Sequence, residues 1–219
     1  MRGRTLGVYA PAMTRRIEAV AVDFGGVLAQ TPTDEAFARL AAAVGIEDDG
    51  LADAWLRHRL EYDLDALDPA QYWSLVGGRG YDGSALEELL VEDAACWAVP
   101  NEAMVAWLSA VKAAGLRLAL LSNMPREQWT RLRAGVSWLD LCDVVILSYE
   151  LRLAKPDPEI YRRCLDRLGL LPHEVVFVDD REENVAAAGG LGFESVLFTT
   201  VDELRRELEL RFAGELPLP

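Results

Sequence analysis

The sequence predicts an α/β fold, in which a parallel sheet carries helices on both faces and a small all-helical segment is inserted after the first strand. Two observations support this. Short apolar runs alternate with helical patterns after residue 100, and only helical patterns are found between residues 31 and 97. A length of 219 residues suits one α/β domain that carries a smaller insertion.

The first predicted strand is the run Ala19-Val20-Ala21-Val22, which stops at Asp23 and is soon followed by Gly25 and Gly26. A run of Val and Ala without charges is typical of a strand buried on both faces of a parallel sheet. Two consecutive glycines allow a sharp turn and bring backbone N–H groups close to a ligand. Asp23 is therefore expected at the carboxyl end of a central strand, where open α/β sheets bind ligands. Taken alone, this window equally fits an aspartate that caps a turn.

The next segment predicts four helices and no convincing strand. The first begins with the capping pattern at residues 31–35 and ends at Gly45. The four predicted helices span residues 31–44, 51–60, 69–76 and 84–90. We expect them to form a compact helical insertion.

Strands and helices alternate from Pro100 onward. Further strands are predicted at residues 116–121, 144–147, 175–178 and 196–198. Helices are predicted from about Met104 to Gly115, at 127–133, from Lys155 to Gly169, at 186–188 and at 201–212. This alternation implies right-handed crossovers and a Rossmann-like parallel sheet.

Composition and charge restrict the possible partners. The formal net charge of −14, without a local basic patch, argues against nucleic acid or an anionic membrane surface as a partner. The three cysteines form no CxxC pair, which favours a reducing cytoplasm. Residues 1–16 are expected to form a flexible N-terminal tail, because their apolar part is too short for a signal peptide or a membrane span.

Polar residues fall where the predicted strands end. Asp23 follows the first strand, Ser122-Asn123 the second and Asp179-Asp180 the fourth, while Lys155 opens the helix after the third. Because parallel strands end at one edge of the sheet, these residues are expected to meet in one cleft.

The chemistry of this set predicts a metal-assisted reaction on a phosphoryl group. Three crowded carboxylates repel one another unless a cation lies between them, and oxygen ligands of this kind suit Mg²⁺. Lys155, Ser122 and the backbone at Gly26 then supply donors for phosphoryl oxygens. A carboxylate such as Asp23 is a suitable nucleophile for an aspartyl-phosphate intermediate.

Four segments resemble, in order, the sequence motifs of the haloacid dehalogenase superfamily: Asp23–Val27, Leu121–Asn123, Lys155–Pro156 and Val178–Asn184. The resemblance extends from about residue 17 to residue 212, and the insertion resembles the small helical C1 cap of that superfamily. It implies that Asp23 is the nucleophile and a Mg²⁺ ligand. It further implies that the Gly25 carbonyl and Asp179 bind the metal, with Asp180 at or near it. Ser122, Asn123 and Lys155 would hold the phosphoryl oxygens. Separately, Asn184 is expected to steady the acidic loop rather than to contact the substrate.

One residue departs from the usual pattern of the superfamily's phosphatases. Most of them carry a second aspartate, the general acid and base, at the position that Gly25 occupies here. Some sugar-1-phosphatase-like members share the Asp-x-Gly-x-Val start. The hypothesis is therefore that the substrate has a good leaving group, such as an anomeric or acyl phosphate, or that a residue of the cap donates the proton. Dehalogenases also lack the second aspartate, but they replace the acidic pair that Asp179-Asp180 retains.

The sequence thus predicts a Mg²⁺-dependent phosphatase that hydrolyses a small phosphorylated metabolite, with sugar phosphates as one candidate class, as a monomer or homodimer. The alternatives are a 2-haloacid dehalogenase-type hydrolase and a non-catalytic relative that keeps the metal site. The predicted core comprises residues 17–30 and 98–219, and the predicted cap residues 31–97. Within the cap, Arg57, His58, Arg59 and Tyr62 are expected on a solvated helix face, with one of them facing the cleft as the alternative. The tryptophans are expected to serve packing.

Overall fold

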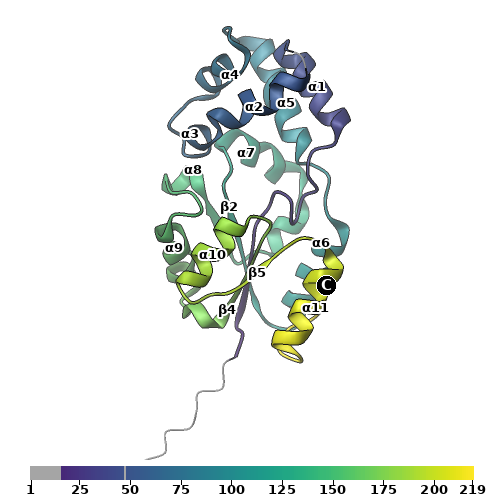
Figure 1. Cartoon of the computed structure of the whole chain (residues 1–219), viewed down its shortest axis with the longest axis vertical. Helices are drawn as coiled ribbons and strands as arrows, with labels where there is room; N and C mark the ends of the chain where they lie inside the picture. Colours follow the sequence, from purple (N-terminus) through teal and green to yellow (C-terminus); the bar gives the residue numbers. More distant parts are fainter. Residues whose placement is uncertain (1–15, 47) are drawn as a thin grey trace, which may run out of the picture.

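The computed structural model of the chain describes residues 16–46 and 48–219, so the predicted flexible tail lies outside the described residues except for Arg16. Its centre is a parallel sheet with the strand order β3-β2-β1-β4-β5 (Figure 1). The strands are β1 (Ala19–Val22), β2 (Arg117–Ser122), β3 (Val144–Leu147), β4 (Val175–Asp179) and β5 (Glu194–Leu197). The predicted α/β class and the central place of the first strand are confirmed.

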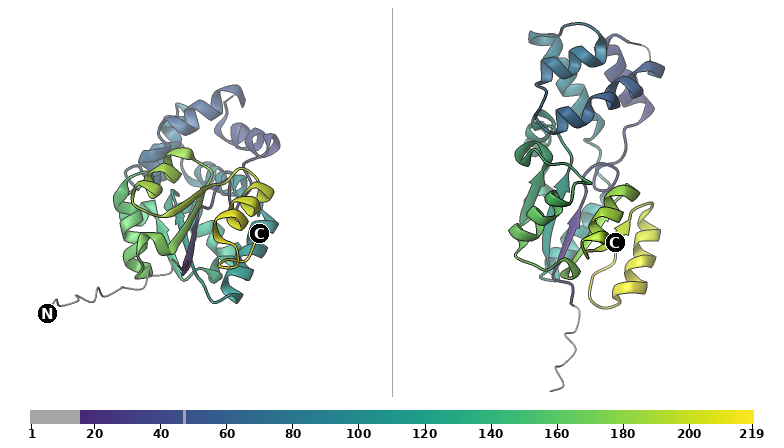
Figure 2. Two further views of the ribbon diagram at one scale, coloured as in Figure 1. Left: turned by 60° about the horizontal axis from the view of Figure 1, so that its bottom comes forward. Right: turned by 60° about the vertical axis from the view of Figure 1, so that its left-hand side comes forward.

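The residues of β1 alternate between the two faces of the sheet, and each face has its own apolar cluster. Val20 and Val22 pack with helices α6 (Glu102–Ala113) and α11 (Val201–Phe212). Ala19 and Ala21 pack with helices α9 (Pro158–Leu168) and α10 (Glu182–Gly190). The sheet is therefore covered on both sides, as the two views of Figure 2 also show, and the uncharged sequence of β1 follows from burial on both faces.

Residues 31–97, as far as the structure describes them, form helices joined by loops and contain no strand, as predicted. The helices are α1 (Asp34–Val44), α2 (Asp48–Arg57), α3 (Arg59–Asp63), α4 (Pro69–Gly77) and α5 (Gly83–Cys96). Thr33 caps α1 by accepting a hydrogen bond from the Ala36 amide, and Gly45 ends it in the left-handed conformation with φ 80°. These helices enclose a separate apolar cluster around Leu40 and Trp73, and they stack above one end of the core (Figure 1).

Two neighbouring linker segments join the core to the cap, and hydrogen bonds connect them. The Gln30 amide donates to the Val99 carbonyl and the Asn101 amide to the Leu28 carbonyl, each at 2.8 Å. This paired crossing and the separate apolar clusters support our proposed division into a core of residues 17–30 and 98–219 and a cap of residues 31–97.

Several elements differ from the prediction in extent. The expected single helix at 51–60 is two helices, α2 and α3, interrupted at His58, whose ψ of 15° departs from helical geometry. Helix α8 (Ser148–Leu151) was not predicted, because four residues are too few to show a helical period. The remaining elements are α7 (Arg126–Gly135) and the 3₁₀ helices η1 (Ser137–Leu141) and η2 (Pro172–Glu174). Among the residues described, no helix combines the length and apolar character needed to span a membrane.

Candidate active site

A buried lysine joins two aspartates at the carboxyl edge of the sheet. Lys155 Nζ lies 2.8 Å from Asp23 Oδ1 and 2.7 Å from Asp179 Oδ2. The Phe24 amide also donates to Asp23 Oδ1, at 2.7 Å. Asp23 follows β1 and Asp179 ends β4, and these two strands are neighbours in the sheet. The structure thus brings these side chains together at the edge of the sheet where the predicted strands end.

Burial and mutual repulsion shape the ionisation of this group. Burial raises the pKa of Asp23 to about 7, with Lys155 opposing the rise and Asp179 and Asp180 adding to it. Burial alone would lower the pKa of Lys155, but the two adjacent carboxylates outweigh it and raise that pKa. The ammonium is therefore held charged, while the carboxylates still have more negative charge than one lysine balances.

Asp180 completes an acidic trio that fits a divalent cation. Ligand oxygens of Asp23, Asp179 and Asp180 all lie within 4.8 Å of one another. Burial, followed by repulsion from Asp179, raises the pKa of Asp180. Gly26 has a φ of 74°, and a Cβ there would clash with the Asp180 carboxylate, so only glycine allows this close approach. Hard oxygen donors at this spacing suit Mg²⁺.

The acidic loop is held by Asn184, as expected for a residue that steadies it. Asp179 Oδ1 accepts hydrogen bonds from the Arg181 amide and from Asn184 Nδ2, each at 2.9 Å. Asn184 Oδ1 is buried and has no donor among the residues that the structure describes. An acceptor left open beside the acidic trio fits a site that holds a hydrated cation.

Ser122 and Asn123, at the end of β2, lie at the same site, and their side chains have different surroundings. Ser122 ends β2 and is 2% exposed. Asn123 uses its side-chain amide on the main chain of Lys155: Nδ2 donates to the carbonyl at 2.9 Å, and Oδ1 accepts from the amide at 2.8 Å. Asn123 thus positions Lys155, and its expected contact with substrate stays a prediction.

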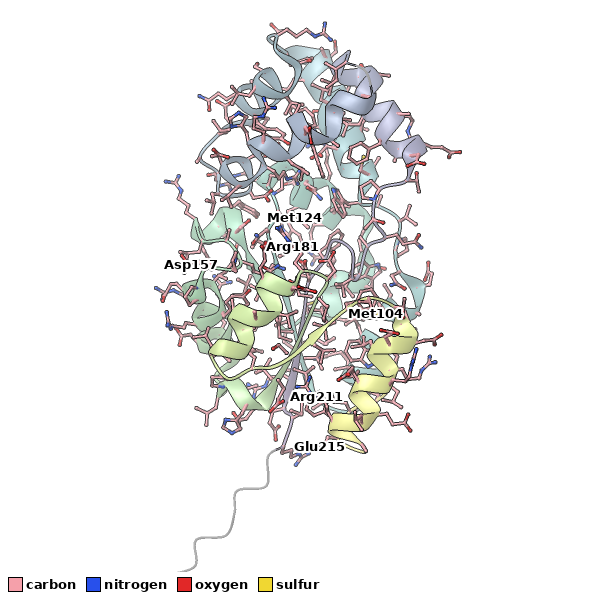
Figure 3. The ribbon with its side chains drawn as sticks, viewed as in Figure 1. Met104, Met124, Asp157, Arg181, Arg211 and Glu215 are labelled. Atoms are coloured by element: carbon pink, nitrogen blue, oxygen red, sulfur yellow. The ribbon has the colours of Figure 1, made fainter. Side chains whose placement is uncertain are left out.

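The site opens into a pocket of about 550 Å³ between the sheet edge and the cap. Its apolar walls are formed by Phe24, Trp55, Leu56, Leu60, Trp97 and Met124. Figure 3 labels Met124 and Arg181, two pocket residues that lie beneath the cap at the upper end of the core.

Trp55 and Trp97 pack in the apolar cluster of the cap, as expected of the tryptophans, and they also form part of this wall. Trp55 and Trp97 stack with ring centroids 6.2 Å apart. A Cβ at Gly25 would lie only 2.9 Å from Trp97 Cζ3. The space beside Gly25, where most phosphatases of the superfamily place an aspartate side chain, is therefore taken by an indole ring.

The cap contributes a buried polar cluster around Arg59. Its Nε donates to Asp63 Oδ1 at 2.9 Å, its Nη1 to Asp93 Oδ1 at 3.3 Å, and its Nη2 to Gln128 of helix α7. The guanidinium also lies over the Trp55 ring, 4.8 Å from the centroid. The expectation of a solvated face is wrong for Arg59 and for the buried Tyr62. The alternative, that one of these residues faces the cleft, is correct for Arg59.

Sequence reasoning missed several pocket residues because no motif marks them. The sequence marks Asp63 only by its spacing four residues after Arg59, which is a signal for an ion pair on one helix face. Trp97 and Gln128 gave no comparable signal, because their neighbours at the site are far apart in the sequence.

Comparison with known proteins identifies the class. A family model of haloacid dehalogenase-like hydrolases matches residues 17–192, and the chain belongs to this family. Among curated proteins, (S)-2-haloacid dehalogenase 4A of Burkholderia cepacia is 31% identical over 172 residues, 72% of this chain and 73% of the relative. The phosphorylated carbohydrates phosphatase of Thermotoga maritima is 36% identical over 115 residues, 51% of each protein.

Two further curated matches cover less than half of their relatives. The matched region is 48% of (S)-2-haloacid dehalogenase 1 of a Pseudomonas species and 11% of mouse acyl-CoA dehydrogenase family member 10. Among solved structures, a haloacid dehalogenase family enzyme from Bacteroides thetaiotaomicron, in complex with magnesium and inorganic phosphate, aligns with a TM-score of 0.66 and 21% identity. That alignment covers 84% of this chain and 94% of the other. At this identity the likeness establishes the fold.

Proposed function

We propose that this hydrolase is a Mg²⁺-dependent phosphatase that cleaves phosphate monoesters through an aspartyl-phosphate on Asp23. The observation that carries the proposal is the acidic trio, whose ligand oxygens lie within 4.8 Å of one another beside a buried lysine. One ammonium cannot balance three carboxylates, so a second cation is needed before an anionic substrate can approach.

The residues divide into metal ligands and phosphoryl ligands. Asp23, Asp179, Asp180 and the Gly25 carbonyl would hold Mg²⁺, which supplies charge neutralisation when bound. Lys155, Ser122 and the main-chain amide of Gly26 would donate to the phosphoryl oxygens. An Asp23 oxygen attacks phosphorus, the bond to the leaving oxygen breaks, and water then hydrolyses the aspartyl-phosphate.

The relatives support a phosphorylated small metabolite as the substrate class, with sugar phosphates included. One curated relative is named for phosphorylated carbohydrates, and one structural neighbour is described with magnesium and inorganic phosphate. The pocket of about 550 Å³ matches the size of a small ester. The stacked rings of Trp55 and Trp97 offer a flat wall for the leaving group.

A 2-haloacid dehalogenase is the second candidate, favoured by the 31% identity to the Burkholderia cepacia enzyme and by Gly25. Halide leaves without a proton, so that reaction needs no general acid. The proximity of Asp180 to Asp23 and Asp179 favours the phosphatase, since a third carboxylate hinders the approach of a haloacid anion unless a cation is bound.

A paired assay distinguishes the candidates. The protein is incubated with a panel of phosphate esters and with 2-haloacids, each with Mg²⁺ and with EDTA, and phosphate and halide release are measured. We expect phosphate release that requires Mg²⁺ and is lost in Asp23→Asn. Metal-independent halide release would establish the dehalogenase instead, and Mg²⁺ binding without any turnover would indicate a non-catalytic relative.

A further inference from the structure

The structure excludes the usual position for the proton donor of a phosphatase in this superfamily. Gly25 has no side chain, and Trp97 fills the adjacent space. A phosphatase that releases an alkoxide still needs a proton at the leaving oxygen. The donor must therefore be another group that faces the pocket. The carboxyl side chains that line it are Asp23, Asp63, Asp180 and Glu183.

Asp63 is the one of these four that suits proton donation. Asp23 and Asp180 belong to the acidic trio, and Glu183 is a solvent-exposed side chain paired with Arg181. Asp63 is 6% exposed and lines the pocket from helix α3 of the cap, across from the sheet edge that carries Asp23. Its Oδ1 accepts from Arg59, while its Oδ2 has no hydrogen bond within residues 16–46 and 48–219.

The backbone of Asp63 is tied directly to the catalytic edge of the core. Ser148, fully buried at the start of α8, donates its hydroxyl hydrogen to the Asp63 carbonyl at 2.6 Å. The same hydroxyl accepts from the amide of Met124, which follows Ser122-Asn123, at 2.9 Å. The backbone that carries the Asp63 carboxyl is thus hydrogen-bonded, through Ser148, to the segment that follows Ser122-Asn123.

We propose that Asp63 is the general acid and base of this enzyme, a role that rests on the proposed phosphatase function. As Asp23 attacks phosphorus, the Asp63 carboxyl gives its proton to the leaving oxygen, which departs as an alcohol. The resulting Asp63 carboxylate then takes a proton from the water that attacks the aspartyl-phosphate. Inorganic phosphate is released, and the Asp23 carboxylate and the Asp63 carboxyl are restored.

The surroundings of Asp63 keep it partly protonated near neutral pH. Burial raises its pKa to about 6, with Arg59 opposing the rise, Asp93 adding to it and Arg181 opposing it. Tyr72, on helix α4, is a further titratable group that interacts with Asp63. A pKa near the working pH suits a group that both donates and accepts a proton.

The test compares Asp63→Asn with a matched control, Asp65→Asn. Asparagine at 63 still offers an oxygen to Arg59 but has no acidic proton. Asp65 is a nearby cap carboxylate paired with Arg126 at 3.1 Å, and it is not part of the pocket. Release of phenol and of 2,4-dinitrophenol from their phosphates is followed under single-turnover conditions with Mg²⁺, across pH.

Phenol needs a proton to leave, whereas dinitrophenolate does not. We expect Asp63→Asn to slow phenol release by about 10²–10⁴-fold, and dinitrophenol release by less than about tenfold. The fall in wild-type phenol release above about pH 6 should disappear in Asp63→Asn and persist in Asp63→Glu and Asp65→Asn. Equal losses for both esters, or an unchanged pH profile, would assign Asp63 a positioning role through Arg59 and overturn the proposal.

Wild-type protein provides a second measure that does not depend on the variant's folding. With a proton donor, rates across a series of aryl phosphates vary little with the acidity of the phenol, whereas a steep dependence contradicts the proposal. Hydrolysis of activated esters only would overturn the role of Asp63 and leave the phosphatase standing. Failure to hydrolyse any ester would refute the phosphatase function itself and Asp63's role with it.

Discussion

At the scale of single residues, the site is organised by Lys155, whose ammonium lies between two buried carboxylates. Removing one partner of such a buried group leaves uncompensated charge and typically costs about 3–5 kcal/mol. Asp180 adds a further negative charge that no lysine at the site balances. The same imbalance that makes the metal-free site costly is the basis of the divalent-cation affinity that we propose.

Gly26 provides a direct test of how Asp180 is placed. We expect Gly26→Ala to destabilise the fold and to weaken Mg²⁺ binding, because it combines a positive φ with a clash against Asp180. Gly78→Ala is the matched control, since its φ of 65° is similar but a Cβ there meets nothing within 4 Å. The left-handed conformation alone costs about 1–2 kcal/mol. Urea unfolding and calorimetric Mg²⁺ titration of both variants measure the two effects, and equal Mg²⁺ affinities would contradict this account of Gly26.

At the scale of elements, the ends of parallel strands determine the site. Asp23, Ser122 and Asp179 were predictable from sequence, because each ends or follows an apolar run and parallel strands share one edge. The cap contribution was not predictable in this way. Trp97 meets Gly25, and Arg59 meets Gln128, through tertiary contacts between elements with no common period or motif. For a related reason, the sequence predicts one helix where the structure has α2 and α3, since nothing in the apolar pattern marks His58 as an interruption.

Ser148 is a buried contact through which α8 connects the cap to the core. We expect Ser148→Ala to lower the free energy of unfolding by about 1–3 kcal/mol, because the buried Met124 amide and Asp63 carbonyl both lose their partner. Ser109→Ala is a suitable control, since its exposed hydroxyl bonds only within its own helix. Denaturant unfolding monitored by tryptophan fluorescence provides the comparison, and equal stabilities of the two variants would show that this link carries no energy.

At the scale of the whole molecule, core and cap each enclose an apolar cluster, and the pocket lies where they meet. The core supplies the acidic trio and the lysine, and the cap supplies Trp55, Arg59 and Asp63. Under the proposed function, relative movement of two such bodies would change the access of water to a bound phosphoryl group. We therefore propose that the core carries the chemistry and that the cap selects the substrate.

Stability of the metal-free protein should depend on pH through Asp23. Its pKa is 3.8 in an unfolded chain and about 7 in the fold, so the folded state binds more protons between these values. Stability from this group is therefore lost as pH rises from about 4 to about 7, by the order of a few kcal/mol. Asp23→Asn lacks this dependence. In EDTA, the unfolding free energy of the wild-type protein should fall relative to that of Asp23→Asn as the pH rises over this range. A difference between the two proteins that does not change with pH would contradict the inference.

The most direct test of the central claim is acid-quench trapping of the phosphorylated enzyme. The protein is mixed with a phosphate ester that it hydrolyses and that carries a label at phosphorus. The reaction is quenched in acid, and the label is mapped to a peptide. We predict label on Asp23 in the presence of Mg²⁺, none in EDTA and none in Asp23→Asn. Phosphate release that continues in Asp23→Asn, or label on another residue, would contradict Asp23 as the nucleophile.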